Sequence, residues 1–143
     1  MLLKIKKLHP DAIIPSYQHE GDSGLSLHAI DDYTLFKNNI ILVDTGIAIE
    51  LPPGYEAQVR PRSGMALKYG VTIVNSPGTI DNYYTGRIQI VMTLIGGDAF
   101  YYIDKGDNIA QLVVKKIEQA EIIEVEELDS TVRGSSSFGS TGR

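Results

Sequence analysis

An acid and an aromatic ring, Asp81 and Tyr84, lie three residues apart between two strand-like runs of the sequence. Pro77 and Gly78 come just before them and favour a turn, because proline fixes φ and glycine tolerates positive φ. We therefore expect a hairpin with Asp81 at its tip, where a carboxylate can hold and activate a water molecule. A ring beside it can pack on the flat face of a base or a sugar. The plainer alternative is an acidic loop whose tyrosine fills the core.

A second group of residues has the chemistry to bind phosphate. Arg62, Ser63 and Gly64 stand at the start of the only helix that the sequence predicts, Ser63–Tyr69. Ser63 is expected to cap this helix, and the free N–H groups of Gly64 and Met65 would then point outward with the helix dipole. An arginine, a hydroxyl and free N–H groups make a candidate phosphate site. The alternative is ordinary capping beside a surface arginine.

Gln111 is a polar residue in an apolar setting. It is expected on the same strand face as Ile109 and Val113. A glutamine that faces an apolar interior needs a hydrogen-bond partner, which can be the backbone, another side chain or an ordered water. Taken alone, this residue is explained by structure as well as by function.

Turn residues divide the chain into about ten short strand-like runs, which cover residues 2–8, 25–29, 33–36, 40–51, 55–60, 70–74, 87–95, 99–103, 109–114 and 121–125. Many short strands between turns are typical of a sandwich, jelly roll or barrel. The run 40–51 is expected to break at Asp44, Thr45 and Gly46. The sequence thus predicts an all-β fold, a jelly-roll-like barrel or sandwich with one short helix.

The last fifteen residues differ from the rest of the chain. Residues 129–143 contain three glycines and five serines, with Val132 and Phe138 as the only large apolar groups. This segment cannot bury enough surface to offset its ordering entropy, so we expect a mobile C-terminal arm after a single β domain, residues 1–128. With Arg133 upstream, the backbone N–H groups of this segment could wrap an anion while the Phe138 ring caps a base. A plain disordered tail is the alternative.

Composition limits the classes of function. The 143 residues carry a net charge of −5, which argues against general binding to nucleic acid or to a membrane surface. The chain has no cysteine, so disulfides and thiolate metal ligands are excluded, and its three histidines lack metal-ligand spacing. The apolar run at the N-terminus is too short for a signal peptide or a membrane span. We expect a cytoplasmic protein.

Four segments, taken in order and spacing, resemble motifs two to five of the dUTPase family. They are Arg62-Ser63-Gly64, Gly78-Thr79-Ile80-Asp81 with Tyr84, Gly106-Asp107 with Ala110-Gln111, and Arg133-Gly134 with Phe138-Gly139-Ser140-Thr141-Gly142. Gly24-Leu25-Ser26-Leu27 with Ala29 resembles motif one imperfectly. The resemblance covers about residues 24–142, which is nearly the whole chain.

The resemblance implies a jelly-roll subunit that assembles as a homotrimer, with active sites shared between chains. It implies hydrolysis of dUTP to dUMP and pyrophosphate with Mg²⁺, in which Asp81 is the general base and Gln111 helps to hold the water. Tyr84 would pack under the deoxyribose and leave no room for a 2′-hydroxyl. Residues around the hairpin would read the uracil edge and exclude a 5-methyl group, namely Asn75, Thr79, Ile80, Asp81 and Gln89.

Two further regions would hold the phosphates and close the site. Arg62, Ser63 and Gly64 would grip the phosphates, and the C-terminal arm would fold over the nucleotide with Phe138 stacked on the uracil. The arm residues involved would be Arg133, Phe138, Gly139, Ser140 and Thr141. No residue is implied as a direct ligand of Mg²⁺, which the substrate phosphates and water would hold, while Ser26 would lie in the outer shell.

The chain departs from the family pattern in several places. Ser26 stands where motif one has an aspartate, and the family's Tyr-Arg-Gly-Glu reads Tyr84-Thr85-Gly86-Arg87 here. The other departures are Tyr83, Asn108, Ser136 and Ser137. They concern metal affinity, ion pairs at the subunit interface and the flexibility of the arm. None affects the base, the ring or the phosphate-binding serine.

Two other functions are compatible with this fold. A dCTP deaminase shares the jelly roll and the trimer, but it needs a glutamate base beside the pyrimidine amino group and lacks the spacing of Asp81 and Tyr84. A nucleotide-binding or regulatory relative without catalysis would keep the fold and explain the departures from the motifs. An assay of pyrophosphate release separates the three.

Overall fold

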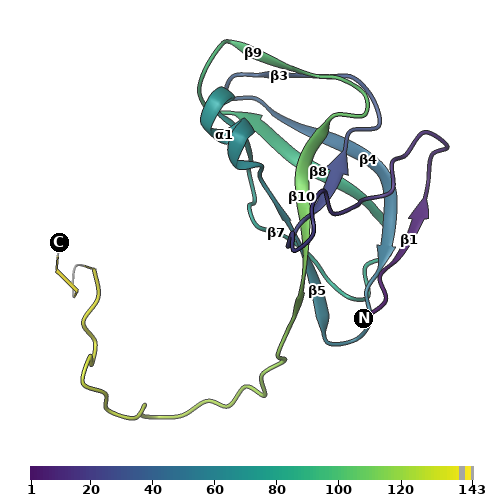
Figure 1. Ribbon diagram of the computed structural model, residues 1–143. Coiled ribbons are helices and arrows are strands. Elements are labelled where there is room, and N and C mark those ends of the chain that lie inside the picture. Colours follow the sequence, from purple (N-terminus) through teal and green to yellow (C-terminus); the bar gives the residue numbers. More distant parts are fainter. Residues whose placement is uncertain (139–140, 143) are drawn as a thin grey trace.

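Two antiparallel sheets form the body of the protein. The computed structural model describes residues 1–138, 141 and 142. Within these residues one sheet has the strand order β1-β4-β8-β6, the other has the order β2-β10-β5-β7, and β3 and β9 form a separate pair (Figure 1). Each large sheet keeps two edge strands, so the all-β prediction is confirmed as an open, jelly-roll-like sandwich.

The strand and helix bounds follow the turn residues closely. The elements are β1 Lys4–Lys7, β2 Leu25–His28, β3 Tyr33–Phe36, β4 Ile40–Glu50, β5 Tyr55–Arg60, α1 Ser63–Tyr69, β6 Val71–Ile73, β7 Gly78–Ile80, β8 Arg87–Leu94, β9 Phe100–Ile103 and β10 Asn108–Lys116. The helix has the predicted bounds. Gly70 ends it in the left-handed region at φ 71°, which a glycine adopts without strain.

Alternating apolar residues of both sheets meet in one core. Fully buried side chains come from strands of each sheet, among them Leu27, Ile47, Ile90, Met92 and Leu112. On β8 the alternation is regular, since Ile88, Ile90 and Met92 are buried while Arg87 and Gln89 are exposed. The buried side of this strand therefore faces the core, and its polar residues lie on the opposite side.

The predicted hairpin is only partly correct. β6 and β8 pair as antiparallel neighbours, with Ile73 opposite Met92. The connection between them is more than a hairpin tip, because it forms a third strand, β7, that pairs with β5 in the other sheet. The chain thus crosses from one sheet to the other and back within fewer than fifteen residues, and Asp81 directly follows β7.

Two other strand predictions need correction. β4 continues through Asp44, Thr45 and Gly46, because the local irregularity is a bulge in its pairing with β8 and does not end the strand. The predicted strand 121–125 is absent from the described chain: Ile117 still donates to the carbonyl of Gly54, but residues 118–128 belong to no strand. The alternation of apolar and acidic residues there resembles a half-buried strand, but these residues are exposed and pair with neither sheet in the described chain.

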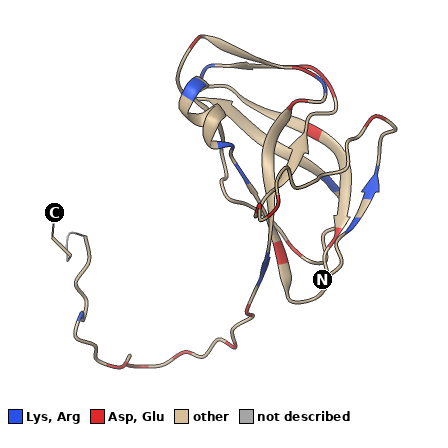
Figure 2. Ribbon diagram, viewed as in Figure 1, with Lys and Arg blue, Asp and Glu red and all other residues tan. Residues whose placement is uncertain are grey.

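Charges are mixed over the surface of the domain. Figure 2 shows basic and acidic residues interspersed in this view, and acidic residues along the segment that leaves β10. Among the described residues, no helix is long and apolar enough to cross a membrane. The cytoplasmic location expected from the sequence stays a prediction.

Candidate functional site

A pocket opens where the chain crosses between the two sheets. β7 is the edge strand of its sheet and pairs only with β5, and β6 pairs only with residues 92–94 of β8. The described residues therefore leave two strand edges that face one another across this gap, one on β7 and one on the first half of β8. Unpaired N–H and C=O groups on such edges are ready to hydrogen-bond a flat polar ligand.

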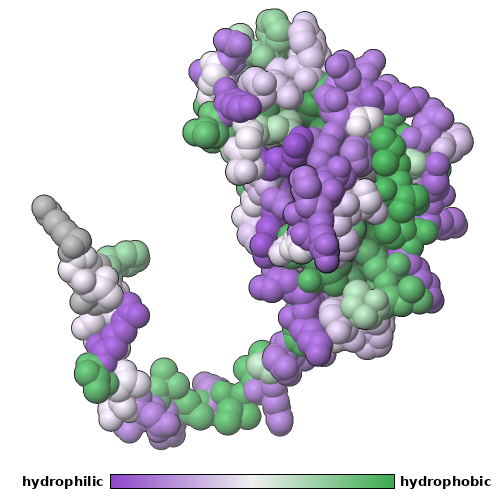
Figure 3. All heavy atoms as spheres, viewed as in Figure 1, coloured by the Kyte–Doolittle hydropathy of each residue, from purple (hydrophilic) through white to green (hydrophobic). Residues whose placement is uncertain are grey.

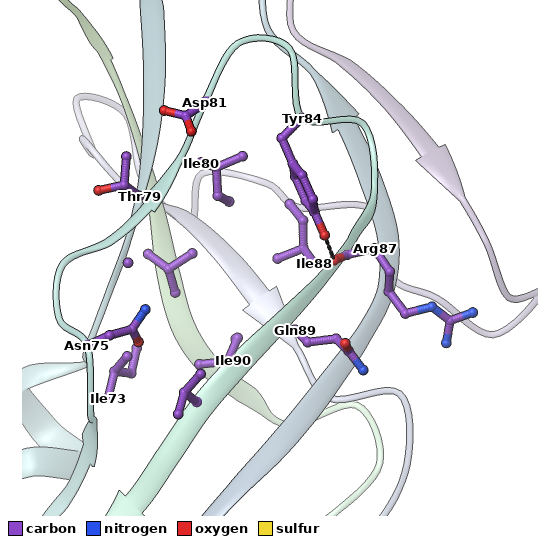
Figure 4. Close-up of a pocket in the computed structure, with 13 residues that line it drawn as sticks. Ile73, Asn75, Thr79, Ile80, Asp81, Tyr84, Arg87, Ile88, Gln89 and Ile90 are labelled. Atoms are coloured by element: carbon purple, nitrogen blue, oxygen red, sulfur yellow. Dashed lines mark hydrogen bonds between the residues drawn. The ribbon is translucent and has the colours of Figure 1, made fainter.

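The pocket has a volume of about 220 Å³ and an apolar floor. It is lined by Val59, Ile73, Asn75, Gly78, Thr79, Ile80, Asp81, Tyr84, Arg87, Ile88, Gln89, Ile90 and Val91. Figure 4 shows Tyr84 on one side, and Thr79 on β7 with Asp81 directly after that strand on the other. We call this pocket the β7–β8 slot. It brings together the residues that were expected to meet the base, the sugar and the attacking water, namely Asn75, Thr79, Ile80, Asp81, Tyr84 and Gln89.

Two hydrogen bonds to backbone carbonyls hold Tyr84 in place. Its Oη donates to the carbonyl of Arg87 at 2.9 Å, and its N–H donates to the carbonyl of Asp81 at 3.0 Å. A Cβ on Gly86 would lie 2.6 Å from the Oη and Cζ atoms of Tyr84, so the ring lies directly against a glycine. With 48% of its surface exposed, the tyrosine is a wall of the slot and does not fill the core.

A second pocket of about 320 Å³ collects the predicted phosphate-binding residues. It is lined by Gln18, His19, Asp22, Ser23, Gly24, Ser26, Arg62, Ser63, Gly64, Asn108, Ala110 and Gln111. We call it the β2–β10 pocket. Asp22 and His19, whose N–H donates to the Asp22 carboxylate at 2.9 Å, were not among the residues singled out from the sequence. The Gly-Asp-Ser-Gly spacing beside a motif-one strand was the signal that could have indicated them.

The prediction that Ser63 caps the helix is wrong. Arg62 is the N-cap residue, with extended backbone angles, and no side chain bonds the first turn. The first helical hydrogen bond runs from the N–H of Ala66 to the carbonyl of Arg62 at 3.0 Å, so Ser63 is already the first helical residue. Its hydroxyl is therefore left to face the pocket. The Arg62 guanidinium donates to the carbonyl of Asn108, which anchors it at the pocket rim.

Gln111 has the partner that its burial requires. Its Nε2 donates to the carbonyl of Pro61 at 3.0 Å. A Cβ on Gly24 would lie 2.5 Å from the Gln111 Oε1, so only a glycine leaves room for this amide. The side chain is thereby fixed between two loops, with its amide on the wall of the β2–β10 pocket.

Ser26 lies at the base of the same pocket and is 5% exposed. Its Oγ accepts a hydrogen bond from Asn108 Nδ2 at 2.8 Å. The other amide atom, Asn108 Oδ1, is buried without a hydrogen-bond partner. Two residues that depart from the family pattern are thus bonded to one another.

The two pockets share no residue and lie well apart in one chain. Gln111 pairs with Arg60, whereas Ile80 pairs with Ala57, which in turn pairs with Val114. At about 3.3 Å per residue and 4.8 Å between strands, Ile80 lies roughly 14 Å from Gln111, and Asp81 follows on the far side. A single water that bonds both side chains requires polar atoms within about 6 Å of one another. One chain alone therefore does not bring Asp81 and Gln111 to the same water.

In Figure 1 the chain beyond β10 extends away from the sandwich. Arg133 bonds only within the arm, from Nε to the carbonyl of Ser136 at 3.2 Å, and Phe138 is fully exposed. Thr141 is exposed as well, while Gly139 and Ser140 fall outside the described residues. Of the arm residues expected over the nucleotide, the described ones, Arg133, Phe138 and Thr141, line neither pocket within this chain.

Known proteins resemble this chain over its full length. A family model for dUTPase matches residues 10–142. The deoxyuridine 5′-triphosphate nucleotidohydrolase of Helicobacter pylori strain P12 is 50% identical over 142 residues, which are 99% of this chain and 97% of that protein. The protein of the same name from Nautilia profundicola is 49% identical over 143 residues, all of both chains.

A solved structure shares the fold. A variant of the Staphylococcus bacteriophage 80alpha dUTPase, solved with dUpNHpp, superimposes with a TM-score of 0.90 and 28% identity, covering 99% of each chain. The agreement extends over the whole sandwich.

Proposed function

The chain belongs to the dUTPase family, and we propose that it hydrolyses dUTP to dUMP and pyrophosphate by attack of a water, activated by Asp81, on the α-phosphate. The water oxygen bonds to the α-phosphorus, its proton passes to the Asp81 carboxylate, and the bond between the α-phosphorus and the bridging oxygen breaks. Pyrophosphate is the leaving group. The observation that carries this proposal is the β7–β8 slot, which has an acid on one wall and an aromatic ring on the other.

The slot suits a uracil nucleoside. The free edges of β7 and β8 offer backbone donors and acceptors to a planar base, and Asn75 adds an amide at the closed end. A floor of isoleucine and valine side chains excludes water from the base faces. Tyr84, held against Gly86, would pack on the sugar and leave no space for a 2′-hydroxyl. Thr79, Ile80 and Gln89 supply the remaining lining.

The β2–β10 pocket would take the phosphates. Arg62, the hydroxyl of Ser63 and the backbone of Gly64 line it, and they offer a cation and hydrogen-bond donors to a polyanion. The described residues contain no group of three acidic or histidine side chains that could hold a metal by themselves. The oxygen donors of Asp22, Ser26 and Gln111 fit a hard cation that the phosphates carry. Mg²⁺ there would neutralise charge on the phosphates.

Replacing Ser26 by aspartate is expected to lower the Mg²⁺ concentration needed for half-maximal rate. A carboxylate accepts bonds from metal-bound waters and adds a charge that a hydroxyl lacks, and outer-shell partners typically change metal affinity by about 10–100-fold. Mg²⁺ titrations of rate for the wild-type and Ser26→Asp proteins measure the shift, which should narrow at saturating metal. Superimposable titrations would mean that position 26 only packs against Asn108.

Assembly with further copies would complete the site. Asp81 and Gln111 need to approach one water, but within one chain Ile80, the residue before Asp81, already lies roughly 14 Å from Gln111. The segment between β10 and the arm also exposes large apolar side chains, and Figure 3 shows green residues along the chain that leaves the sandwich. They are Ile122, Ile123, Val125 and Leu128, with exposures of 91%, 72%, 51% and 88%. Apolar groups gathered in this way favour contact with another subunit. We propose a homotrimer with shared sites.

Light scattering tests the assembly. A trimer should give about three times the chain mass of 15.7 kDa. A heterologous interface can close into a ring of three subunits, in which each contact surface is used once. A stable monomer with full dUTP hydrolysis would contradict the shared site.

Pyrophosphate release tests the proposed reaction. The purified protein, given dUTP, dCTP or UTP with Mg²⁺, is expected to release pyrophosphate from dUTP in strong preference to the other two. Ammonia release from dCTP would instead indicate a deaminase. Binding of dUTP without any turnover would indicate a nucleotide-binding relative.

A further inference from the structure

We propose that Asp44 and Arg87 form a positioning pair for the Tyr84 ring, and so help to set the preference for deoxyribose over ribose. The inference rests on the proposed function, because it takes Tyr84 as the wall that meets the sugar. Neither Asp44 nor the side chain of Arg87 is assigned a role in the reaction above. Their place in the fold gives them one.

Tyr84 is bound to the main chain of Arg87. The tyrosine is about half exposed, so packing in the core does not fix its ring. The ring is held by the bond from its Oη to the Arg87 carbonyl, at 2.9 Å, and by contact with Gly86. The position of the sugar wall therefore depends on where the first residue of β8 lies.

Arg87 is in turn bound to β4 through its side chain. Its guanidinium extends away from the Tyr84 ring in Figure 4 and forms an ion pair with Asp44. The Asp44 side chain is only 13% exposed. Its Oδ1 accepts from the N–H of Gly46 at 2.8 Å, and its own carbonyl accepts from the N–H of Ile30 at 2.9 Å. The carboxylate is thus held by the backbone and can anchor the half-exposed Arg87 side chain.

The pairing of β4 with β8 explains why such an anchor is needed. Asp44 lies opposite Gln89, and Ala48 lies opposite Arg87, so three residues of β4 face only Ile88. Regular ladder bonds are interrupted at this bulge, next to the start of β8. Side chains span the gap: Thr45 Oγ1 donates to the Ile88 carbonyl at 2.6 Å, and Asp44 holds Arg87.

A partly exposed ion pair contributes little to stability, but it restricts where its residues lie. Misplacement of a substrate-contacting group by about 1 Å can change a rate by as much as 100-fold. Loosening the pair should therefore disturb the sugar wall more than it disturbs the fold.

Asp44→Asn and Arg87→Met test the pair, since asparagine still accepts the bond from Gly46 and methionine keeps the length of the stem. Each variant is expected to lower the preference for dUTP over UTP, measured as the ratio of kcat/KM values, on the order of tenfold. Arg87→Lys keeps the charge and should recover part of the preference. Glu50→Gln, which removes the Lys4 ion pair on the same β4 strand, is the matched control and should leave the ratio unchanged.

A second readout does not depend on activity. In protein labelled with 3-fluorotyrosine, the ¹⁹F signal of residue 84 is assigned by its loss in Tyr84→Phe. That signal should shift in Asp44→Asn and Arg87→Met and stay in place in Glu50→Gln. An unchanged signal in both variants would overturn the positioning role, and an unchanged nucleotide preference despite a shifted signal would overturn the role in specificity. If the wild-type protein hydrolysed neither nucleotide, the proposed function would fall, while the fluorine signal would still decide the positioning role.

Discussion

Replacing Asp81 by asparagine is expected to lower kcat for dUTP hydrolysis by a factor of about 100 or more, the usual scale for loss of a positioned general base. Asparagine has nearly the same shape but cannot accept the proton of the attacking water. The backbone carbonyl of residue 81 would still accept the N–H of Tyr84, so the loop should keep its form. Nucleotide affinity should therefore change much less than kcat. Steady-state kinetics with separate measurement of nucleotide binding resolve the two effects.

Asp98→Asn is the matched control for this substitution. Asp98 is exposed and lines neither pocket, so its replacement removes the same charge without touching the site. It should leave kcat near the wild-type value. Near-normal kcat in Asp81→Asn would refute the assignment of the base, and an equal loss in both variants would point to net charge as the cause.

The strand and helix bounds could be predicted because turn chemistry in this sequence is local. Lys37-Asn38-Asn39, Pro52-Pro53-Gly54 and Lys105-Gly106-Asp107 each end a run of alternating residues, and the strands stop at or near them. The helix 63–69 also follows from local signals, since Gly70 ends it in a conformation that suits glycine. Where neighbouring residues decide the local structure, the sequence was sufficient to predict the bounds of an element.

The crossing of the chain between the sheets could not be predicted in the same way. Gly78, Thr79 and Ile80 contain too few residues to show an alternation, and their partner β5 lies about twenty residues upstream. Pairing across such a distance is decided by packing, which a local pattern does not record. The β7–β8 slot depends on this crossing. The sequence therefore predicted which residues line the slot, but it did not predict the shape of the slot.

The candidate site shows a similar division. Motif order pointed to Asp81, Tyr84, Ser63 and Gln111, and each lines a pocket. One chain places these residues in two separate pockets. Only the strand register of the structure shows this separation. The pairing of Arg87 with Asp44 was also beyond reach, because the two residues lie 43 positions apart. The sequence had marked Arg87 only as a departure from the family pattern.

Ending the chain at Thr131 is expected to abolish most of the dUTP hydrolysis while leaving the assembly intact. Residues 118–138 are exposed throughout, so the described residues that the truncation removes contribute nothing to the core. It does carry Arg133 and Phe138, which are proposed to reach the nucleotide only when the arm closes over a site. Closure would exclude water, add a cation beside the phosphates and cover the base. Pyrophosphate release and light scattering, measured on the same preparation, report the two properties separately.

A single substitution in the full-length chain separates loss of the arm from loss of its ring. Phe138→Ala keeps the arm and Arg133, so it should raise KM for dUTP and lower the rate less than the truncation does, because one base–aromatic stack typically contributes about 1–3 kcal/mol. Val132→Ala, which changes the other large apolar residue of the arm, should stay close to the wild-type protein. Full activity in the truncated chain would refute the closing arm. Dissociation into monomers would show instead that residues beyond 131 hold subunits together, and the exposed apolar segment before them would then not suffice for assembly.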